Sequence, residues 1–124
     1  MNDFVYTKGW KYRLEEDYTV QLNFTPKVAI DAKWISVTIT GLLTLKSGYA
    51  WDGASGPTID SEESVMPSAV HDASYQLIGM NVANLDDRKK ADKMFYNLCI
   101  EEGMNPLRAS LWYVAVRWFG GRHV

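Results

Sequence analysis

Polar and apolar residues alternate with a period of two along much of the stretch between Phe4 and Leu45. The apolar members of this pattern are Val20, Leu22, Phe24, Ile35, Val37, Ile39, Leu43 and Leu45. Such alternation is typical of strands that bury one face and expose the other. It predicts an antiparallel β meander over residues 1–45. Gly41, inside the pattern, indicates a bulge or a close approach of two backbones.

Apolar residues follow a helical spacing in three later segments, at residues 64–79, 86–102 and 105–119. Ser64 and Asn105 are placed to cap the first and third of these helices. A proline suited to the first turn follows each cap, namely Pro67 and Pro106. Residues 46–63 are rich in glycine, proline, serine and aspartate and predict a long ordered loop. We therefore expect an α+β fold in a single domain, 1–124, with a β meander (1–45), a glycine-rich loop (46–63) and helices (64–124).

The third helix is apolar nearly all round, and two interpretations of it remain open. It can be the buried central helix of a small domain. Alternatively, its aromatic residues and nearby arginines can form a belt that faces lipid. The residues of such a belt would be Trp112, Tyr113, Trp118, Phe119, Arg117 and Arg122.

Composition narrows the classes of protein that this chain can represent. Hydrophobic residues make up 47% and charged residues 23% of 124 residues, which is ordinary for a globular domain. A net charge of -2 without a basic run argues against a nucleic-acid partner. The lone Cys99 excludes an internal disulfide. We expect no signal peptide and no transmembrane segment, because neither a basic start nor an apolar run of about 20 residues occurs.

The residues with the clearest chemical potential are His71, Asp72 and Tyr75 on the first expected helix, and Asp92 on the second. His71 and Tyr75 share one helical face, and Asp72 points about 100° away. Two helices with a short connection usually pack antiparallel, which could bring Asp92 beside His71. A carboxylate there would hold the imidazole of a general base. The alternative is a cap or a satisfied polar core without catalysis.

A candidate cation site lies in the glycine-rich loop, which begins Trp51-Asp52-Gly53. Carboxylate and carbonyl oxygens from an adaptable loop are the ligands that calcium prefers. One internal histidine and one cysteine argue against zinc.

The segment His71-Asp72-Ala73-Ser74-Tyr75 resembles the H-D-x-x-Y core of phospholipase A2 enzymes. The segment from Ala91 to Phe95 is similar to the later A/I-D-x-x-F motif of their prokaryotic branch. The resemblance implies a helix pair of phospholipase A2 type, with His71 as the base and Asp92 as its partner. It also implies that calcium binds Asp72, Asp52 and carbonyls near Gly53. Tyr75 and Trp51 would contact substrate or support the site. The chain departs from the secreted enzymes because its one cysteine cannot form an internal disulfide and because we expect no secretion signal.

Nearly the whole chain resembles an uncharacterised family of tailed phages and prophages. The shared motifs are D-G-A-S-x-P at Asp52, H-D-x-x-Y at His71, R-x-x-A-D-x-x-F at Arg88 and V-R-x-F-G at Val116. This resemblance implies a phage or prophage origin, with the protein in the host cytoplasm or the virion, and implies no particular activity.

Two functions follow as hypotheses. The first is a calcium-dependent lipid-ester hydrolase whose partner is phospholipid or a membrane surface. The second is a non-catalytic virion or tail-associated protein that contacts other phage structural proteins and uses the polar cluster as a brace. A metal-dependent peptidoglycan hydrolase is a weaker third, because the usual zinc ligands are missing.

Overall fold

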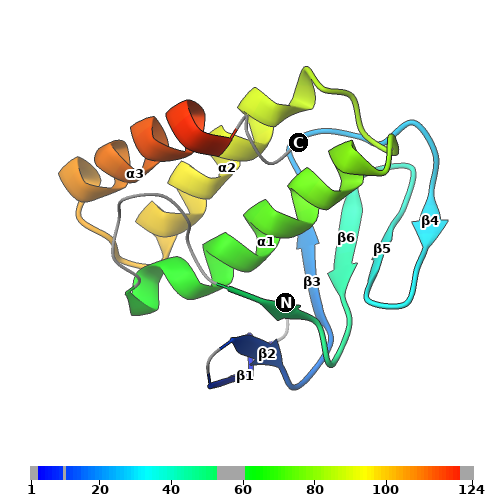
Figure 1. Cartoon of the computed structure of the whole chain (residues 1–124), viewed down its shortest axis with the longest axis horizontal. Coiled ribbons are helices and arrows are strands. Elements are labelled where there is room, and N and C mark those ends of the chain that lie inside the picture. The colour runs from blue at the N-terminus through cyan, green and yellow to red at the C-terminus, as the bar shows by residue number, and fades with distance from the viewer. Residues whose placement is uncertain (1–2, 10, 53–60, 121–124) are drawn as a thin grey trace.

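A computed structural model describes residues 3–9, 11–52 and 61–120, apart from the side chain of Phe119. Within these ranges the strands come first and the helices follow, so the expected α+β class is confirmed (Figure 1). The strands are β1 (Tyr6–Lys8), β2 (Tyr12–Leu14), β3 (Tyr18–Gln21), β4 (Ile30–Asp31), β5 (Ile35–Val37), β6 (Leu42–Leu45) and β7 (Ala50–Trp51). The helices are α1 (Glu62–Gly79), α2 (Asp87–Glu101) and α3 (Pro106–Phe119).

The strands divide between two antiparallel sheets rather than forming one continuous meander. One sheet has the order β1-β2-β7 and the other has the order β3-β6-β5-β4. β4, β5 and β6 pair consecutively, whereas β3 pairs with β6 and β7 returns to β2. The period-two pattern identifies the buried faces correctly at Ile35, Val37, Leu43 and Leu45. Ile39 is the exception, because it lies beyond the end of β5 and is 56% exposed.

Gly41 occupies the turn between β5 and β6, where its φ is +89°. A Cβ atom at this position would lie 2.6 Å from the carbonyl oxygen of Phe24. A residue with a side chain would therefore face both an unfavourable φ and a backbone contact. This geometry corresponds to the close approach that the sequence indicated.

The stretch expected to be a loop, residues 46–63, contains β7 and the start of α1. The helix begins at Glu62 with Ser61 as its cap, so the predicted cap at Ser64 is wrong. The hydroxyl of Ser64 instead donates to the carbonyl oxygen of Ser61 at 2.8 Å and accepts from the Ser61 N–H at 3.2 Å. These bonds satisfy backbone groups at the helix start from inside the first turn. Pro67 consequently lies inside the helix rather than in its first turn.

The two later helices match the sequence expectations closely. Asp86 is the cap residue of α2, and Asn105 is the cap residue of α3. The Asn105 side chain accepts a hydrogen bond from the Leu107 N–H at 2.9 Å, and Pro106 is the first helical residue. Proline fits this position because the first helical N–H has no partner within the helix.

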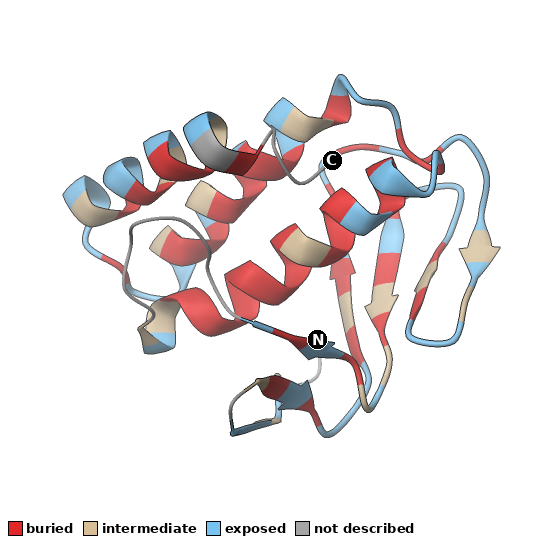
Figure 2. Ribbon diagram, viewed as in Figure 1, coloured by how far each residue is buried: buried red, intermediate tan, exposed pale blue. Residues whose placement is uncertain are grey.

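The helices pack in chain order, α1 against α2 and α2 against α3. α1 is the most deeply covered, since its apolar residues share one core cluster with residues of both sheets (Figure 2). α3 is buried on one side only: Trp112 is 3% exposed, whereas Trp118 is 74% exposed. Of the helices in the described part of the chain, none combines the length and apolar character needed to cross a bilayer.

Candidate functional site

Two faces of α1 carry the residues singled out from the sequence. Positions 71 and 75 lie one turn apart and face α2, where their side chains contact Asp92. Positions 68, 72 and 76 form a second stripe, about 100° away. On this stripe, Ser68 is hydrogen-bonded to Trp51, which belongs to β7. Gln76 is hydrogen-bonded to Tyr49, the residue just before β7. One helix therefore positions two separate polar groups.

On the α2 side, the structure brings His71, Tyr75 and Asp92 together. Nε2 of His71 lies 2.6 Å from Oδ1 of Asp92. The hydroxyl of Tyr75 donates to the same carboxylate oxygen at 2.5 Å. Asp92 is fully buried, and His71 and Tyr75 are each 8% exposed. Within the described residues the Nδ1 atom of His71 has no hydrogen-bond partner, so this nitrogen is the one available for further chemistry.

Two arginines complete the surroundings of Asp92. Nη1 of Arg117 donates to Oδ2 of Asp92 at 2.7 Å, from near the end of α3. Nη1 of Arg88 lies 3.8 Å from the same oxygen, one helical turn before Asp92 on α2. Arg88 also donates to the Tyr75 hydroxyl and to the Arg117 carbonyl oxygen, both at 3.4 Å. Helices α1 and α3 therefore hydrogen-bond one carboxylate, and Arg88 of α2 adds an ion pair to it.

Sequence reasoning did not place Arg88 or Arg117 beside Asp92. Arg88 could have been found, because a cation four residues before a carboxylate on a helix is a common pair. Arg117 gave no such signal, since its contact depends on how α3 packs against α2. Both residues belong to motifs quoted above, but a motif alone does not say which group a side chain meets.

The donors around Asp92 decide its protonation state. Burial by itself raises the pKa of a carboxyl group, but the bonds from His71, Tyr75 and Arg117 outweigh it and hold the pKa of Asp92 below its ordinary value. Burial, together with the adjacent Asp92 carboxylate, raises the pKa of the Tyr75 hydroxyl. At neutral pH, Asp92 is therefore an anion and Tyr75 is a neutral donor to it.

The β7 side of α1 is held by neutral hydrogen bonds. The indole N–H of Trp51 donates to the Ser68 hydroxyl at 2.9 Å, and Trp51 is 3% exposed. The amide of Gln76 donates to the Tyr49 hydroxyl at 2.9 Å. Trp51 thus attaches β7 to α1.

Asp72 lies on this stripe, between Ser68 and Gln76, and is half-buried. Burial raises the pKa of the Tyr49 hydroxyl, and the negative charge of Asp72 raises it further. The carboxylate of Asp72 is therefore close to the segment that leads through β7 into the glycine-rich loop.

The other two expected metal ligands are Asp52 and Gly53. The Asp52 side chain is 78% exposed. Its Oδ1 atom lies 3.7 Å from Nζ of Lys11, so the carboxylate forms an ion pair with that lysine. Gly53 lies outside the described residues. Over residues 3–9, 11–52 and 61–120, no three histidine, cysteine, aspartate or glutamate side chains form a group suited to a metal. The assignment of Asp72 as a calcium ligand stays a prediction.

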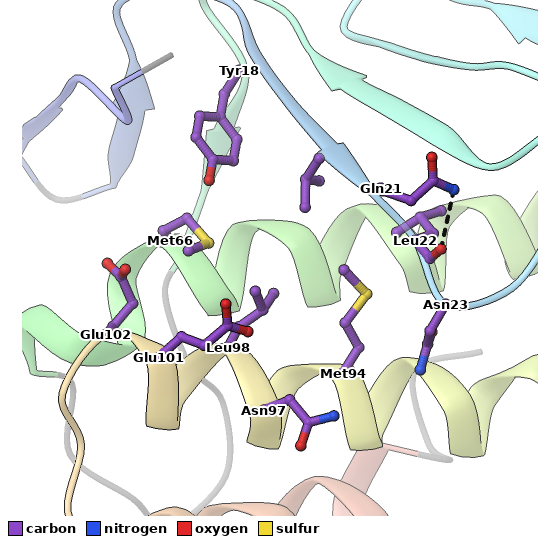
Figure 3. Close-up of a pocket in the computed structure, with 11 residues that line it drawn as sticks. Tyr18, Gln21, Leu22, Asn23, Met66, Met94, Asn97, Leu98, Glu101 and Glu102 are labelled. Atoms are coloured by element: carbon purple, nitrogen blue, oxygen red, sulfur yellow. Dashed lines mark hydrogen bonds between the residues drawn. The ribbon is translucent and has the colours of Figure 1, made fainter. Parts of the chain in front are cut away.

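A groove of about 410 Å³ lies on another side of the helix pair, between β3, α1 and α2 (Figure 3). Met66, Met94 and Leu98 contribute apolar lining, and Glu101 and Glu102 lie at one end. On α2, Met94 points about 160° away from Asp92, given the helical repeat. The groove is therefore separate from the His71–Asp92 pair.

Cys99 is not a candidate nucleophile. It is fully buried, and burial raises the pKa of its thiol to about 12. A thiol of this kind stays protonated at neutral pH and is inert.

The arrangement defines an α+β protein with a histidine–carboxylate pair buried between two antiparallel helices. The model of the family "Protein of unknown function (DUF1353)" matches residues 27–116, and the chain belongs to that family. Neither a curated protein nor a solved structure matches the chain.

Proposed function

We propose that this protein is a calcium-dependent lipid-ester hydrolase of phospholipase A2 type, encoded by a phage or prophage. The observation that carries the proposal is the contact of His71 Nε2 with Asp92, with Tyr75 bonded to the same oxygen. A carboxylate at Nε2 fixes the tautomer in which Nε2 carries the proton. Nδ1 then has a free lone pair, which can take a proton from water.

The residues around the pair favour this use of the imidazole. Asp92 is held on both oxygens, so the His71 ring has a fixed orientation when water approaches Nδ1. As His71 gains a proton, the adjacent anion stabilises the imidazolium that forms. His71 is the general base in this scheme, and Asp92 and Tyr75 are positioning residues.

Asp72 and carbonyl oxygens of the following loop would hold calcium, because these are hard oxygen donors. Calcium bound there would supply Lewis-acid polarisation of an ester carbonyl and would stabilise negative charge on its oxygen. Asp72 directly follows His71 on α1. A calcium ion bound to Asp72 and the imidazole of His71 would therefore contact the same substrate from one helix.

The proposal is tested by calcium-dependent hydrolysis of phosphatidylglycerol–phosphatidylcholine vesicles, measured as released fatty acid. His71→Gln should reduce the rate about 100- to 10,000-fold, the usual contribution of one general base, and should retain the native circular dichroism spectrum. Asp72→Asn should weaken calcium binding in calorimetry, whereas Asp31→Asn, an exposed carboxylate in β4, should not. An inactive wild type with no calcium heat at millimolar concentration would reject the hydrolase.

The runner-up is a non-catalytic virion or tail-associated protein. It is favoured by the full pairing of the Asp92 carboxylate, since a buried anion that is hydrogen-bonded by α1 and α3 and paired with Arg88 also serves as a structural brace. For such a protein, His71→Gln should lower the melting temperature and no lipid should be hydrolysed. Purified virions or tails should then contain the protein when probed with an antibody.

A further inference from the structure

The outer face of α3 is exposed to solvent (Figure 2). Four large apolar residues of this helix are exposed. Their exposed fractions are 72% for Leu107, 62% for Leu111, 60% for Val114 and 74% for Trp118. The opposite side of the helix is buried against α2 through Ala109, Trp112 and Val116. We name the four exposed residues the α3 stripe.

The α3 stripe has the spacing of a helix–helix seam. Its members are separated by four, three and four residues, which is the alternation of a and d positions in a heptad. Given 3.6 residues per turn, all four lie within an arc of about 60°. A stripe this narrow matches the line of contact between two helices, whereas a helix lying in a lipid surface presents a broader apolar face.

The residues that border the α3 stripe are two arginines and two small residues. Arg108 and Ala115 border one side, and Ser110 and Arg117 border the other. Both arginines are occupied within their own molecule: Arg117 bonds Asp92, and the guanidinium of Arg108 lies 5.9 Å from the centre of the Trp112 ring. No carboxylate occurs in α3.

An antiparallel pair of α3 helices keeps the arginines beside the α3 stripe apart. In such a pair, equivalent flanking positions meet across the seam. Arg108 then faces Ala115 of the second copy, and Ser110 faces its Arg117, so that no two like charges oppose each other. Leu111 faces Val114, and Leu107 faces Trp118. We propose that α3 is a self-association surface through which two copies of this chain form an antiparallel dimer.

The size of the α3 stripe sets the expected strength of the dimer. Four side chains of one helix provide less contact than the roughly 800 Å² per partner of a standard stable interface. The dimer should therefore form reversibly, with dissociation in the micromolar to millimolar range, as is usual for small interfaces. The inference is independent of any hydrolytic activity.

Sedimentation equilibrium of the purified chain from about 10 μM to about 1 mM tests the proposal over the range expected for a small interface. The wild type should pass from monomer towards dimer. Leu111→Lys and Val114→Lys should each weaken association at least about tenfold, and circular dichroism should show an unchanged fold because both positions are exposed. Leu85→Lys is the matched control, since Leu85 is 68% exposed but lies outside α3.

Cross-linking tests the orientation. In the antiparallel arrangement, a Leu111→Cys variant mixed with a Val114→Cys variant should form a mixed disulfide faster than either variant alone, in a Cys99→Ala background. A wild type that stays monomeric, or association that Leu111→Lys leaves unchanged, would overturn the proposal. So would a monomer whose tryptophan fluorescence shifts on phosphatidylglycerol vesicles and whose shift is lost in Leu111→Lys, because the partner would then be lipid.

Discussion

The two polar faces of α1 are built in different ways. The face towards α2 surrounds one buried anion, Asp92, with hydrogen bonds from α1 and α3 and an ion pair from Arg88 of α2. The face towards β7 uses neutral pairs, Trp51 with Ser68 and Gln76 with Tyr49. A buried charge is costly unless it is fully paired, whereas a neutral hydrogen bond can be lost without leaving an uncompensated charge. Removing one group from the first face should therefore destabilise the whole cluster around Asp92. Removing one group from the second face should cost only the free energy of the bond that is lost.

The largest effect should come from removing the anion. Asp92→Asn leaves Arg117 and Arg88 without their buried counter-ion, and breaking a buried pair in this way typically costs about 3–5 kcal/mol. Urea denaturation of the variant and the wild type measures the loss. Asp52→Asn, at an exposed position, should stay within about 0.5 kcal/mol of the wild type. Equal losses in the two variants would contradict the contrast between buried and exposed carboxylates.

Removing one hydroxyl from each face compares the faces directly. Tyr75→Phe deletes a bond to an ionised acceptor and should cost about 1.5–3 kcal/mol. Tyr49→Phe deletes a neutral bond from the exposed Gln76 and should cost about 0.5–1.5 kcal/mol. The same urea experiment applies, and a larger loss for Tyr49→Phe would reverse the proposed order of the two faces.

The space around Tyr75 offers a third comparison. Gly120 is buried, and a Cβ atom there would collide with the Tyr75 hydroxyl. Gly120→Ala should destabilise the chain by about 1–3 kcal/mol, because the ring must move away from Asp92. In the Tyr75→Phe background the same change should cost less, since the colliding oxygen is gone. A double-mutant cycle measures this coupling, and additive losses would show that Gly120 acts elsewhere.

Acid should weaken the α2 face more than the β7 face. The pKa of Asp92 is lowered in the folded chain, so its contribution is fully present above the ordinary aspartate value of about 3.9. That contribution is lost as the pH falls through the lower, folded value. Between pH 6 and 2, the wild type should therefore lose stability more steeply than Asp92→Asn, by at most about 1.4 kcal/mol per pH unit for one proton. Parallel pH profiles would exclude Asp92 as the source.

The sequence predicted those features that depend on local spacing. The cap of α3, the extent of α2, the buried strand positions and the meeting of His71 with Asp92 all follow from short-range signals and a short connection between helices. The start of α1 was misjudged because both Ser61 and Ser64 are good capping residues. Their roles depend on a hydrogen bond within the first turn that the pattern does not distinguish.

Features that depend on distant packing could not be predicted. The division into two sheets requires β7 to return to β2, and no local pattern specifies that pairing. The contact of Arg117 with Asp92 depends on the angle at which α3 crosses α2. Trp112 is buried and Trp118 is exposed. The sequence could not distinguish them, because apolar residues occur all round α3 and do not show which side α2 covers.

The position of Arg117 along the chain has a consequence for synthesis. His71, Tyr75, Arg88 and Asp92 all leave the ribosome before Arg117 does. Until α3 emerges and docks, the Oδ2 atom of Asp92 lacks its nearest cation, and the pair with His71 lies beside an incompletely balanced charge. Domains generally acquire their structure from the N-terminal side during translation. In this protein, the last helix to be made would set the moment at which the polar cluster becomes complete.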